Sequence, residues 1–259
     1  MSVIDIFNLQ NPWRKDADFK ADPYFPRMLF PAILKWLNEP EIIVLIGPRQ
    51  SGKTTIMYKL IEHILNENIA PESIFFFNCD NLNIQSFFDN IPEFIRFLNQ
   101  KNPHENSIVL IDELQRLPNP GLFLKEIFDL PSKIKLIVSG SSSLEIKSKI
   151  KETLTGRKKV FNILPFNFME LLTKDNDYKE LITLPPNEII ENYHYFDKIW
   201  GSKLILELIR FLNYGGYPRV LQTDDVEKKK HILNEIFTSY VQKDISDFLK
   251  VENISGFNK

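Results

Sequence analysis

Short apolar runs alternate with amphipathic segments along the first two thirds of the chain. Runs with the length and composition of buried parallel strands cover residues 41–46, 73–78, 107–112, 134–139 and 158–163. Between them lie segments with apolar residues at helical spacing, over 53–66, 84–100, 120–129 and 142–152. This alternation predicts an α/β fold in which a central, parallel, five-stranded sheet is flanked by helices.

A glycine-rich loop joins the first predicted strand to the first predicted helix. Residues 47–54 read GPRQSGKT and match the phosphate-binding pattern G-x-x-x-x-G-K-[ST]. We expect backbone N–H groups of residues 50–54 and the helix N-terminus to surround the phosphates. Lys53 would then reach the β- and γ-phosphates, and the Thr54 hydroxyl would bind Mg²⁺. The residues predicted to bind nucleotide are Gly47, Pro48, Arg49, Gln50, Ser51, Gly52, Lys53, Thr54 and Thr55.

An acidic pair, Asp112 and Glu113, follows the apolar run at 107–111. An aspartate at the carboxyl end of a buried strand is the expected second Mg²⁺ ligand of a P-loop protein, directly or through water. The adjacent Glu113 is the natural general base for an attacking water. The sequence lacks the N-K-x-D motif of GTPases, so the pair favours ATP hydrolysis. The alternative is an acidic pair that simply ends a strand.

Two more features are expected at the same edge of the sheet. A serine of SGSSS, residues 139–143, could orient the attacking water or contact the γ-phosphate, and the alternative is that it caps the helix that follows. Different serines of the cluster could serve both roles. Arg157, at the end of LTGR, has three interpretations: an arginine finger across a subunit interface, a γ-phosphate sensor in its own site, or a surface residue.

Composition narrows the class of protein. With 259 residues, 43% hydrophobic and a net charge of −2, the chain reads as globular and not as a protein whose whole surface binds nucleic acid. Eight basic residues over 133–159 fit either a local nucleic-acid or subunit-facing patch or a solvated helix face. The single cysteine, Cys79, excludes an internal disulfide and is expected to be a small buried residue. With neither a signal peptide nor a membrane-spanning run, a cytoplasmic protein is expected.

Further motifs support a family resemblance. In order, GPRQSGKTT, IVLIDE, LIVSGSSS, LTGRKK and LPFNFMELL resemble a large prokaryotic AAA+ ATPase family. NPWR at 11–14, PYFPRMLFPAILKWL at 23–37, YGGYPRV at 214–220 and SYVQKDISDFL at 239–249 resemble other segments of that family. The resemblance implies ATP or ADP and Mg²⁺ as ligands. It also makes Ser141 the candidate sensor and Arg157 the candidate finger.

The resemblance also implies a domain organisation. Members carry an N-terminal AAA+ domain and a C-terminal domain of unknown function with a winged-helix-like part. We expect an N-terminal extension over 1–30, the AAA+ core over 31–165, a helical linker or lid over 166–210 and the start of a shortened C-terminal domain over 211–259. The implied partners are ATP, a second copy of the chain through an arginine finger, and DNA or a protein through the rest of the C-terminal domain. A nucleotide-dependent switch or a DNA-associated regulatory ATPase with little turnover stays open as the alternative.

Overall fold

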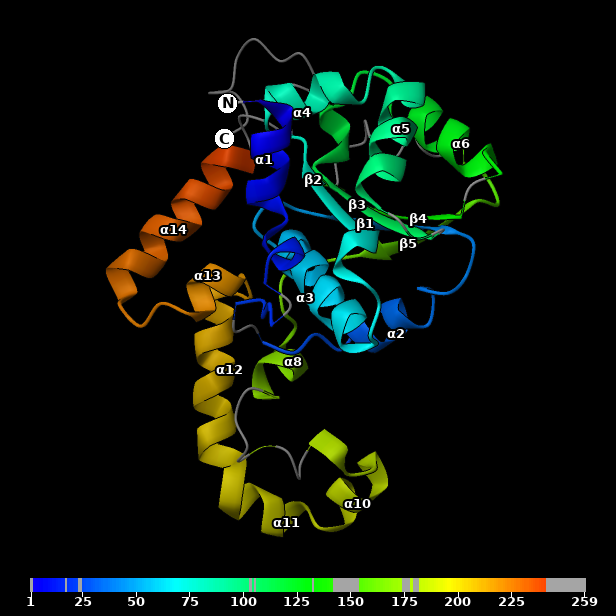
Figure 1. Ribbon diagram of the computed structural model, residues 1–259. Coiled ribbons are helices and arrows are strands. Elements are labelled where there is room, and N and C mark those ends of the chain that lie inside the picture. The colour runs from blue at the N-terminus through cyan, green and yellow to red at the C-terminus, as the bar shows by residue number, and fades with distance from the viewer. Residues whose placement is uncertain are drawn as a thin grey trace. The chain divides into compact units, whose positions relative to one another are not determined.

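The computed structural model describes residues 2–16, 18–22, 25–102, 104, 106–131, 133–141, 154–173, 178 and 182–240 (Figure 1). By their contacts the residues form two compact units. The first unit consists of residues 1–23, 31–48 and 53–163, and the second of residues 24–30, 49–52 and 164–259. The second unit therefore includes two short segments from the N-terminal part of the chain.

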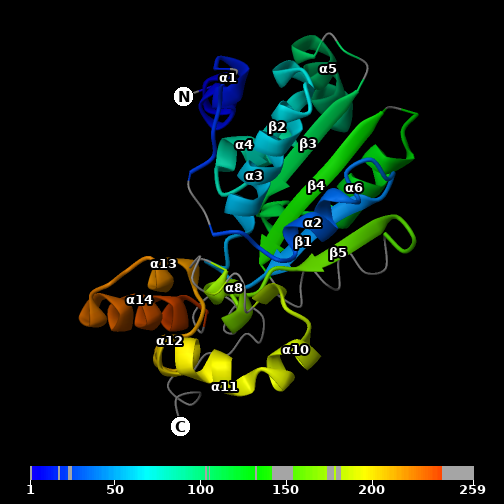
Figure 2. The same ribbon diagram turned by 90° about the horizontal axis from the view of Figure 1, so that it is seen from below.

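The first unit contains a parallel sheet of five strands in the order β2-β3-β4-β1-β5 (Figure 2), which confirms the predicted fold class. The strands are β1 (Ile42–Gly47), β2 (Ile74–Asn78), β3 (Ser107–Asp112), β4 (Ile134–Ser141) and β5 (Lys158–Asn162). β4 lies between β1 and β3. Because all the pairings are parallel, the carboxyl ends of these three strands meet at one edge of the sheet.

The helices that accompany the sheet are α1 (Val3–Gln10), α2 (Phe30–Leu34), α3 (Lys53–Asn66), α4 (Leu82–Phe87), α5 (Ile91–Lys101) and α6 (Pro120–Asp129). Single 3₁₀ turns cover Pro12–Arg14, Pro71–Ser73 and Leu114–Arg116. The prediction of one helix over 84–100 is wrong, since α4 and α5 are separate. Pro92 has no N–H to donate to the preceding turn, and the Asn90 side chain begins α5 by accepting a hydrogen bond from Glu93 N. The helix predicted over 142–152 lies outside the described residues.

Both faces of the sheet are covered, which explains why its strands read as continuous apolar runs. On one face, Phe75 and Phe77 of β2 belong to a core that includes Phe94 of α5 and Phe123 of α6. α3 packs against β1 and β4 and buries five apolar side chains: Ile56, Met57, Leu60, Ile61 and Ile64.

The N-terminal segment covers the open edge of β2 with side chains. Asn11 acts like a strand residue: its Nδ2 donates to Phe76 O at 2.8 Å, and its Oδ1 accepts from Phe76 N at 2.7 Å. Arg14 Nη1 donates to Ile74 O at 3.1 Å, and Gln10 Oε1 accepts from Asn78 N at 3.0 Å. These contacts satisfy backbone groups that would otherwise invite pairing with another chain.

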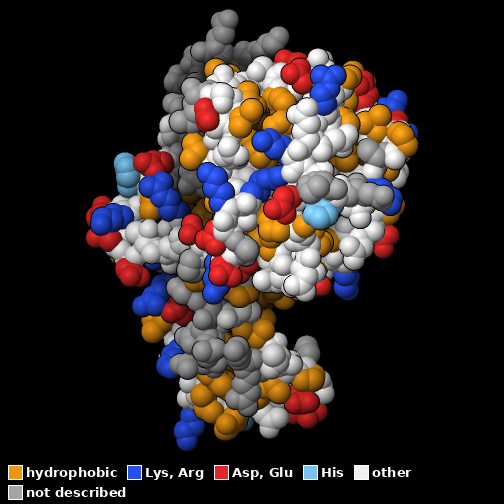
Figure 3. Space-filling view, in the orientation of Figure 1, with side chains coloured by type: hydrophobic (Ala, Val, Ile, Leu, Met, Phe, Trp, Pro, Cys, Tyr) orange, Lys and Arg blue, Asp and Glu red, His pale blue; other side chains and the backbone are white. Residues whose placement is uncertain are grey.

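The described part of the second unit is helical, as predicted for the C-terminal segment. Its helices are α8 (Phe168–Leu172), α10 (Pro186–Glu191), α11 (Tyr193–Phe196), α12 (Ser202–Tyr214), α13 (Pro218–Leu221) and α14 (Val226–Ser239), with a π-helical stretch at Asp197–Gly201. Among its described residues, one small apolar cluster forms around Phe196 and Trp200 and another around Val220 and Ile236. Hydrophobic side chains of α10 and α11 are exposed to solvent (Figure 3), among them Ile190, Tyr193 and Tyr195.

Asn11→Ala should lower the free energy of unfolding by about 2–3 kcal/mol, because a buried amide with several hydrogen bonds is lost and the backbone of Phe76 is left unpaired. Gln10→Ala is the matched control, since it removes a single bond next to the same strand and should cost less than about 1 kcal/mol. Urea denaturation measures both variants. Equal losses would contradict the role given to Asn11.

Candidate functional site

Asp112 lies at the carboxyl end of β3 and is 1% exposed. Its Oδ2 accepts a hydrogen bond from Thr54 Oγ1 at 2.7 Å, and its Oδ1 accepts one from the hydroxyl of Ser139. Thr54 stands in the first turn of α3, and Ser139 lies on β4. A single buried carboxylate thus joins three neighbouring elements. The structure brings together the two residues, Thr54 and Asp112, that were predicted to hold Mg²⁺.

Ser139 contributes more to this arrangement than the sequence indicated. Its Oγ also accepts from Glu113 N at 3.4 Å, so one hydroxyl contacts both members of the acidic pair. Ser141, the serine favoured by the family resemblance, extends β4 by two residues and pairs in register with Gly47. The role of Ser141 stays a prediction, and Ser142 and Ser143 lie outside the described residues. The position of Ser139 at the end of the predicted strand 134–139 is the signal that could have singled it out.

Glu113 leaves the strand with a left-handed backbone, at φ 55°. Its Oε2 accepts a hydrogen bond from Gln115 Nε2. Burial raises the pKa of Glu113 above its ordinary value; the positive charge of Lys53 opposes the rise and the negative charge of Asp112 adds to it. A carboxylate with a raised pKa is a stronger proton acceptor than an ordinary one.

The glycine-rich loop has the backbone that an anion site needs. Gln50 and Gly52 both have positive φ, 61° and 94°, and such residues curve the chain so that successive N–H groups converge. Ser51 is fully buried, and its Oγ has no hydrogen-bond partner among the described residues. Lys53 is 4% exposed, and its Nζ donates to the carbonyl oxygens of Gly47 and Pro48, both at 3.0 Å.

The residues present fit the ligands that the sequence predicts. A carboxylate and a hydroxyl, from Asp112 and Thr54, are the hard oxygen donors that Mg²⁺ prefers. A buried ammonium group and an unpaired buried hydroxyl, from Lys53 and Ser51, suit phosphate oxygens. Arg49 and Thr55, also predicted to bind nucleotide, stand in the loop and in the first turn of α3.

Arg157 lies at the other edge of the sheet, and the expectation that it shares an edge with Asp112 is wrong. Its carbonyl accepts from Ile42 N at 2.9 Å, at the amino ends of β1 and β5. Its Nε pairs with Asp129 Oδ1 at 3.1 Å. The residue precedes its strand instead of following it, so this placement does not support a sensor role in its own site. A finger acting on a neighbouring subunit stays a prediction.

Several basic side chains of the stretch 133–159 contact the fold itself. Lys135 Nζ donates to the carbonyl oxygens of Trp36, Glu39 and Glu41, and its burial lowers its pKa to about 8. Lys159 Nζ lies 4.5 Å from the centre of the Trp36 ring. These charges therefore stabilise local structure; a nucleic-acid role for the stretch stays a prediction.

Cys79 is confirmed as a buried core residue. It has no exposed surface and belongs to the same apolar core as Phe75 and Phe77. Burial raises the pKa of its thiol far above the ordinary value, which disfavours the reactive thiolate. The next residue, Asp80, pairs with Arg116 at 2.9 Å.

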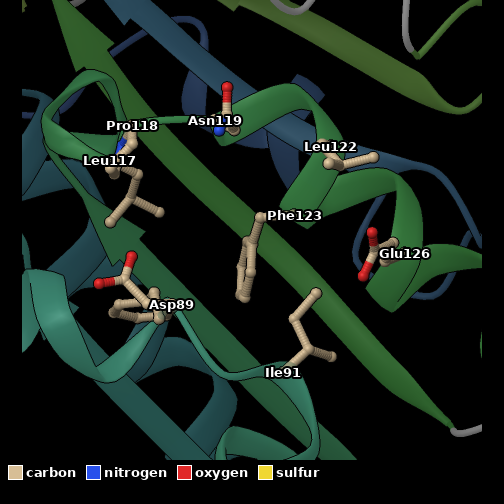
Figure 4. Close-up of a pocket in the computed structure, with 9 residues that line it drawn as sticks. Asp89, Ile91, Leu117, Pro118, Asn119, Leu122, Phe123 and Glu126 are labelled. Atoms are coloured by element: carbon tan, nitrogen blue, oxygen red, sulfur yellow. The ribbon is translucent and has the colours of Figure 1, made fainter.

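A separate hollow of about 190 Å³ lies beside α6 (Figure 4). Phe123 and Leu117 contribute apolar surface, and Asp89 and Glu126 contribute carboxylates. Its lining residues include none of those predicted for the nucleotide site. Among the described residues, no helix is both long and apolar enough to cross a membrane.

A parallel sheet with a glycine-rich loop after β1 and a buried aspartate ending β3 defines a P-loop nucleotide-binding fold. A family model described as an AAA domain matches residues 39–172, more than half of the chain. The chain belongs to this AAA domain family, whose members are P-loop ATPases, and membership implies nucleotide binding.

Curated relatives come from both prokaryotic domains. An uncharacterized protein of the archaeon Methanocaldococcus jannaschii is 27% identical over 215 residues, which cover 83% of this chain and 44% of the relative. An uncharacterized protein of the bacterium Haemophilus influenzae is 24% identical over 216 residues, which cover 83% of this chain and 48% of the relative. The chain thus spans about half the length of the curated relatives that it matches.

Two solved structures show weaker likeness. A Walker-type ATPase of Pyrococcus abyssi has a TM-score of 0.45 and 17% identity, over 88% of this chain and 78% of that one. PCH-2 of C. elegans has a TM-score of 0.39 and 16% identity, over 72% of this chain and 55% of that one. At these TM-scores, neither adds to the family assignment.

Ser139→Ala should lower the free energy of unfolding by about 1–3 kcal/mol, because a buried oxygen of Asp112 loses its donor. Ser141→Ala, on the same strand and equally buried, is the matched control and should cost less. Chemical denaturation compares the two variants. A loss at Ser141 as large as that at Ser139 would contradict the special position of Ser139.

Proposed function

We propose that this chain binds ATP with Mg²⁺ and hydrolyses ATP to ADP and phosphate. The observation that carries the proposal is the buried carboxylate of Asp112, which contacts Thr54 at the start of α3 and Ser139 on β4. It stands at the carboxyl edge of the sheet, where open α/β sheets bind their ligands. Membership of the AAA domain family supports the same conclusion.

Each group in the proposed site has a distinct task. Backbone N–H groups of residues 50–54 and the ammonium group of Lys53 bind the phosphates. Thr54 and Asp112 hold Mg²⁺, which when bound offsets the negative charge of the β- and γ-phosphates. Ser139 keeps the Asp112 carboxylate oriented through its hydrogen bond.

Glu113 is the proposed general base. Its carboxylate takes a proton from water as the water oxygen bonds to the γ-phosphorus, and the bond to the bridging oxygen breaks so that ADP leaves. The raised pKa of Glu113 favours proton acceptance, and its backbone N–H is held by Ser139. Ser141 pairs with Gly47 and is the proposed contact for the γ-phosphate or for the attacking water.

One contact favours a second candidate function, a nucleotide-dependent switch with little turnover. The side chain of Gln115 donates a hydrogen bond to the carboxylate of Glu113. While that bond persists, the base is engaged within its own turn and is not directed at water. Release of Glu113 would then be the controlled step, and the bound nucleotide would set a conformation.

A second copy of the chain is the proposed partner for hydrolysis. The side chain of Arg157 is 35% exposed, at the edge of the sheet opposite Asp112. From there it would act on the site of a neighbour. DNA or a protein is a further proposed partner. It would bind through the part of the longer relatives that this chain does not match, and the described residues offer no specific contact for it.

ATP turnover with Mg²⁺, measured across protein concentrations, tests the main proposal. Lys53→Ala should abolish ATP binding, whereas Glu113→Gln should retain binding and lose turnover by about 10²–10⁴-fold. Glu126→Gln, an exposed residue of α6, is the control for a lost carboxylate and should turn over ATP like the wild type. ATP binding without turnover at any concentration would establish the switch instead; no binding by the wild type would refute both.

Mixing two inactive variants tests the role of Arg157 between subunits. Arg157→Ala and Glu113→Gln should each be inactive alone, and an equal mixture should recover about a quarter of the wild-type rate. Recovery is expected because some sites then combine an intact Glu113 with an intact Arg157 from the neighbour. A mixture of Arg157→Ala with the double variant must stay inactive. Failure of the first mixture to recover would refute action between subunits.

A further inference from the structure

Arg27 is a buried arginine that none of the sequence motifs singled out. It is 7% exposed and belongs to the second unit, with the loop residues 49–52 and with α8. Its Nη1 donates to Ser51 O at 3.1 Å, and its Nη2 donates to Leu164 O at 2.6 Å. Its guanidinium carbon lies 4.3 Å from the centre of the Phe166 ring. One side chain therefore contacts the glycine-rich loop and the segment that leads into α8.

Glu170 fixes the position of Arg27. Its Oε1 accepts from Arg27 Nε at 3.0 Å and from Met28 N at 2.9 Å, and the Glu170 side chain is 4% exposed. Its Oε2 accepts from Asn167 N at 3.1 Å, as part of the capping box that begins α8. Because both partners of the ion pair are buried, displacing Arg27 would leave an uncompensated charge, which is strongly unfavourable.

The contact with Ser51 determines how one peptide of the loop is oriented. A trans peptide is planar, so when the Ser51 carbonyl faces Arg27 the N–H of Gly52 points the opposite way. In the phosphate-binding pattern such N–H groups are the anion ligands. The unpaired, fully buried Ser51 Oγ is a second polar group left for a ligand within the described part of the chain.

Phe166 and Gly52, which neighbour Arg27 and its partner Ser51, are closely packed against residues 216–218. Phe166 N donates to Gly216 O at 2.8 Å, and a side chain at Gly216 would collide with the Phe166 carbonyl. Pro218 Cγ lies 3.7 Å from the point where a Cβ of Gly52 would stand. The segment before α13 thus packs closely on the backbone of Phe166, whose ring Arg27 covers.

We propose that Arg27 is a positioning residue for phosphate binding: it holds the Ser51–Gly52 peptide in its anion-binding orientation, and Glu170 holds Arg27. This inference rests on the proposed function, in that the loop is taken to bind nucleotide phosphates. By reciprocity, phosphate binding at the loop strengthens the contacts that join Arg27 to α8. The loop and α8 are thereby linked through one ion pair.

The chain offers a matched control arginine. Arg14 also donates to backbone carbonyls, those of Glu72, Ile74 and Lys101, and it also covers an aromatic ring, that of Phe75. It has no contact with the loop in the described structure. Arg14→Lys therefore has the stability cost of replacing a guanidinium group that makes several hydrogen bonds, but it changes no residue near the proposed phosphate site.

Calorimetric titration of the full chain with ATP and, separately, with pyrophosphate tests the proposal. Arg27→Lys should weaken the affinity for both ligands by about tenfold at unchanged stoichiometry, because the ammonium group cannot serve Glu170 and Ser51 together. Arg14→Lys should leave both affinities unchanged while lowering the Tm. Glu170→Gln, which keeps its shape, should weaken both affinities less, and its effect should not add to that of Arg27→Lys.

The outcomes separate this inference from the proposed function. Wild-type affinity in Arg27→Lys, or a reduced stoichiometry with unchanged affinity, would overturn the positioning role while leaving ATP binding intact. If Arg27→Lys does not fold, wild-type affinity in Glu170→Gln overturns the role, and weakened binding of both ligands in that variant supports it. No ATP or pyrophosphate binding by the wild type would overturn the proposed function and this inference together.

Discussion

The arrangement of the sheet edge depends on keeping the Asp112 carboxylate hydrogen-bonded on both oxygens. At 1% exposure, a charge without donors would cost several kcal/mol. Thr54 and Ser139 supply the donors, one from the helix after β1 and one from β4. This requirement brings the start of α3 to the end of β3. It also explains why a serine stands where the strand would otherwise carry another apolar residue. The beginning of α3, and with it the end of the glycine-rich loop, is thereby fixed.

The residues of the glycine-rich loop and those that follow it belong to different compact units. Lys53 and Thr54 belong by their contacts to the sheet unit, whereas residues 49–52 belong to the helical unit through Arg27 and Pro218. Positive φ at Gln50, a residue with a Cβ, leaves its backbone strained unless neighbours support it. The Arg27–Glu170 pair is such a support, since it is buried and its remaining donors and acceptors are bonded to backbone. In the proposed function, a ligand of residues 49–52 is therefore linked energetically to this ion pair.

The parts of the fold that follow local rules were predictable. Buried parallel strands and the loop pattern are carried by consecutive residues, so β1 to β5 and the segment at 47–54 could be found from the sequence. The break between α4 and α5 was missed because the apolar spacing continues across it. α4 ends at Phe87, and Pro92, which has no N–H to donate to the preceding turn, stands in the first turn of α5. Arg27 was missed because its partners, Ser51, Leu164 and Glu170, are 24, 137 and 143 residues away, and no spacing rule reports such contacts. Arg157 was assigned to the wrong edge because it stands before its strand.

In the proposed function, the balance between hydrolysis and switching depends on Glu113. Its backbone is fixed by the left-handed turn and by the bond to Ser139, so only its side chain is free to change partners. The bond from Gln115 is a hydrogen bond to a charged group, and such bonds contribute about 1.5–3 kcal/mol. Burial already disfavours the ionised form of Glu113, and the positive charge of Lys53 opposes that effect. A nucleotide that moves Lys53 toward its phosphates would change that environment directly. The free energy needed to break the bond between Gln115 and Glu113 is within the range that ligand binding supplies. The same contacts are therefore compatible with a slow ATPase whose turnover a neighbouring subunit accelerates.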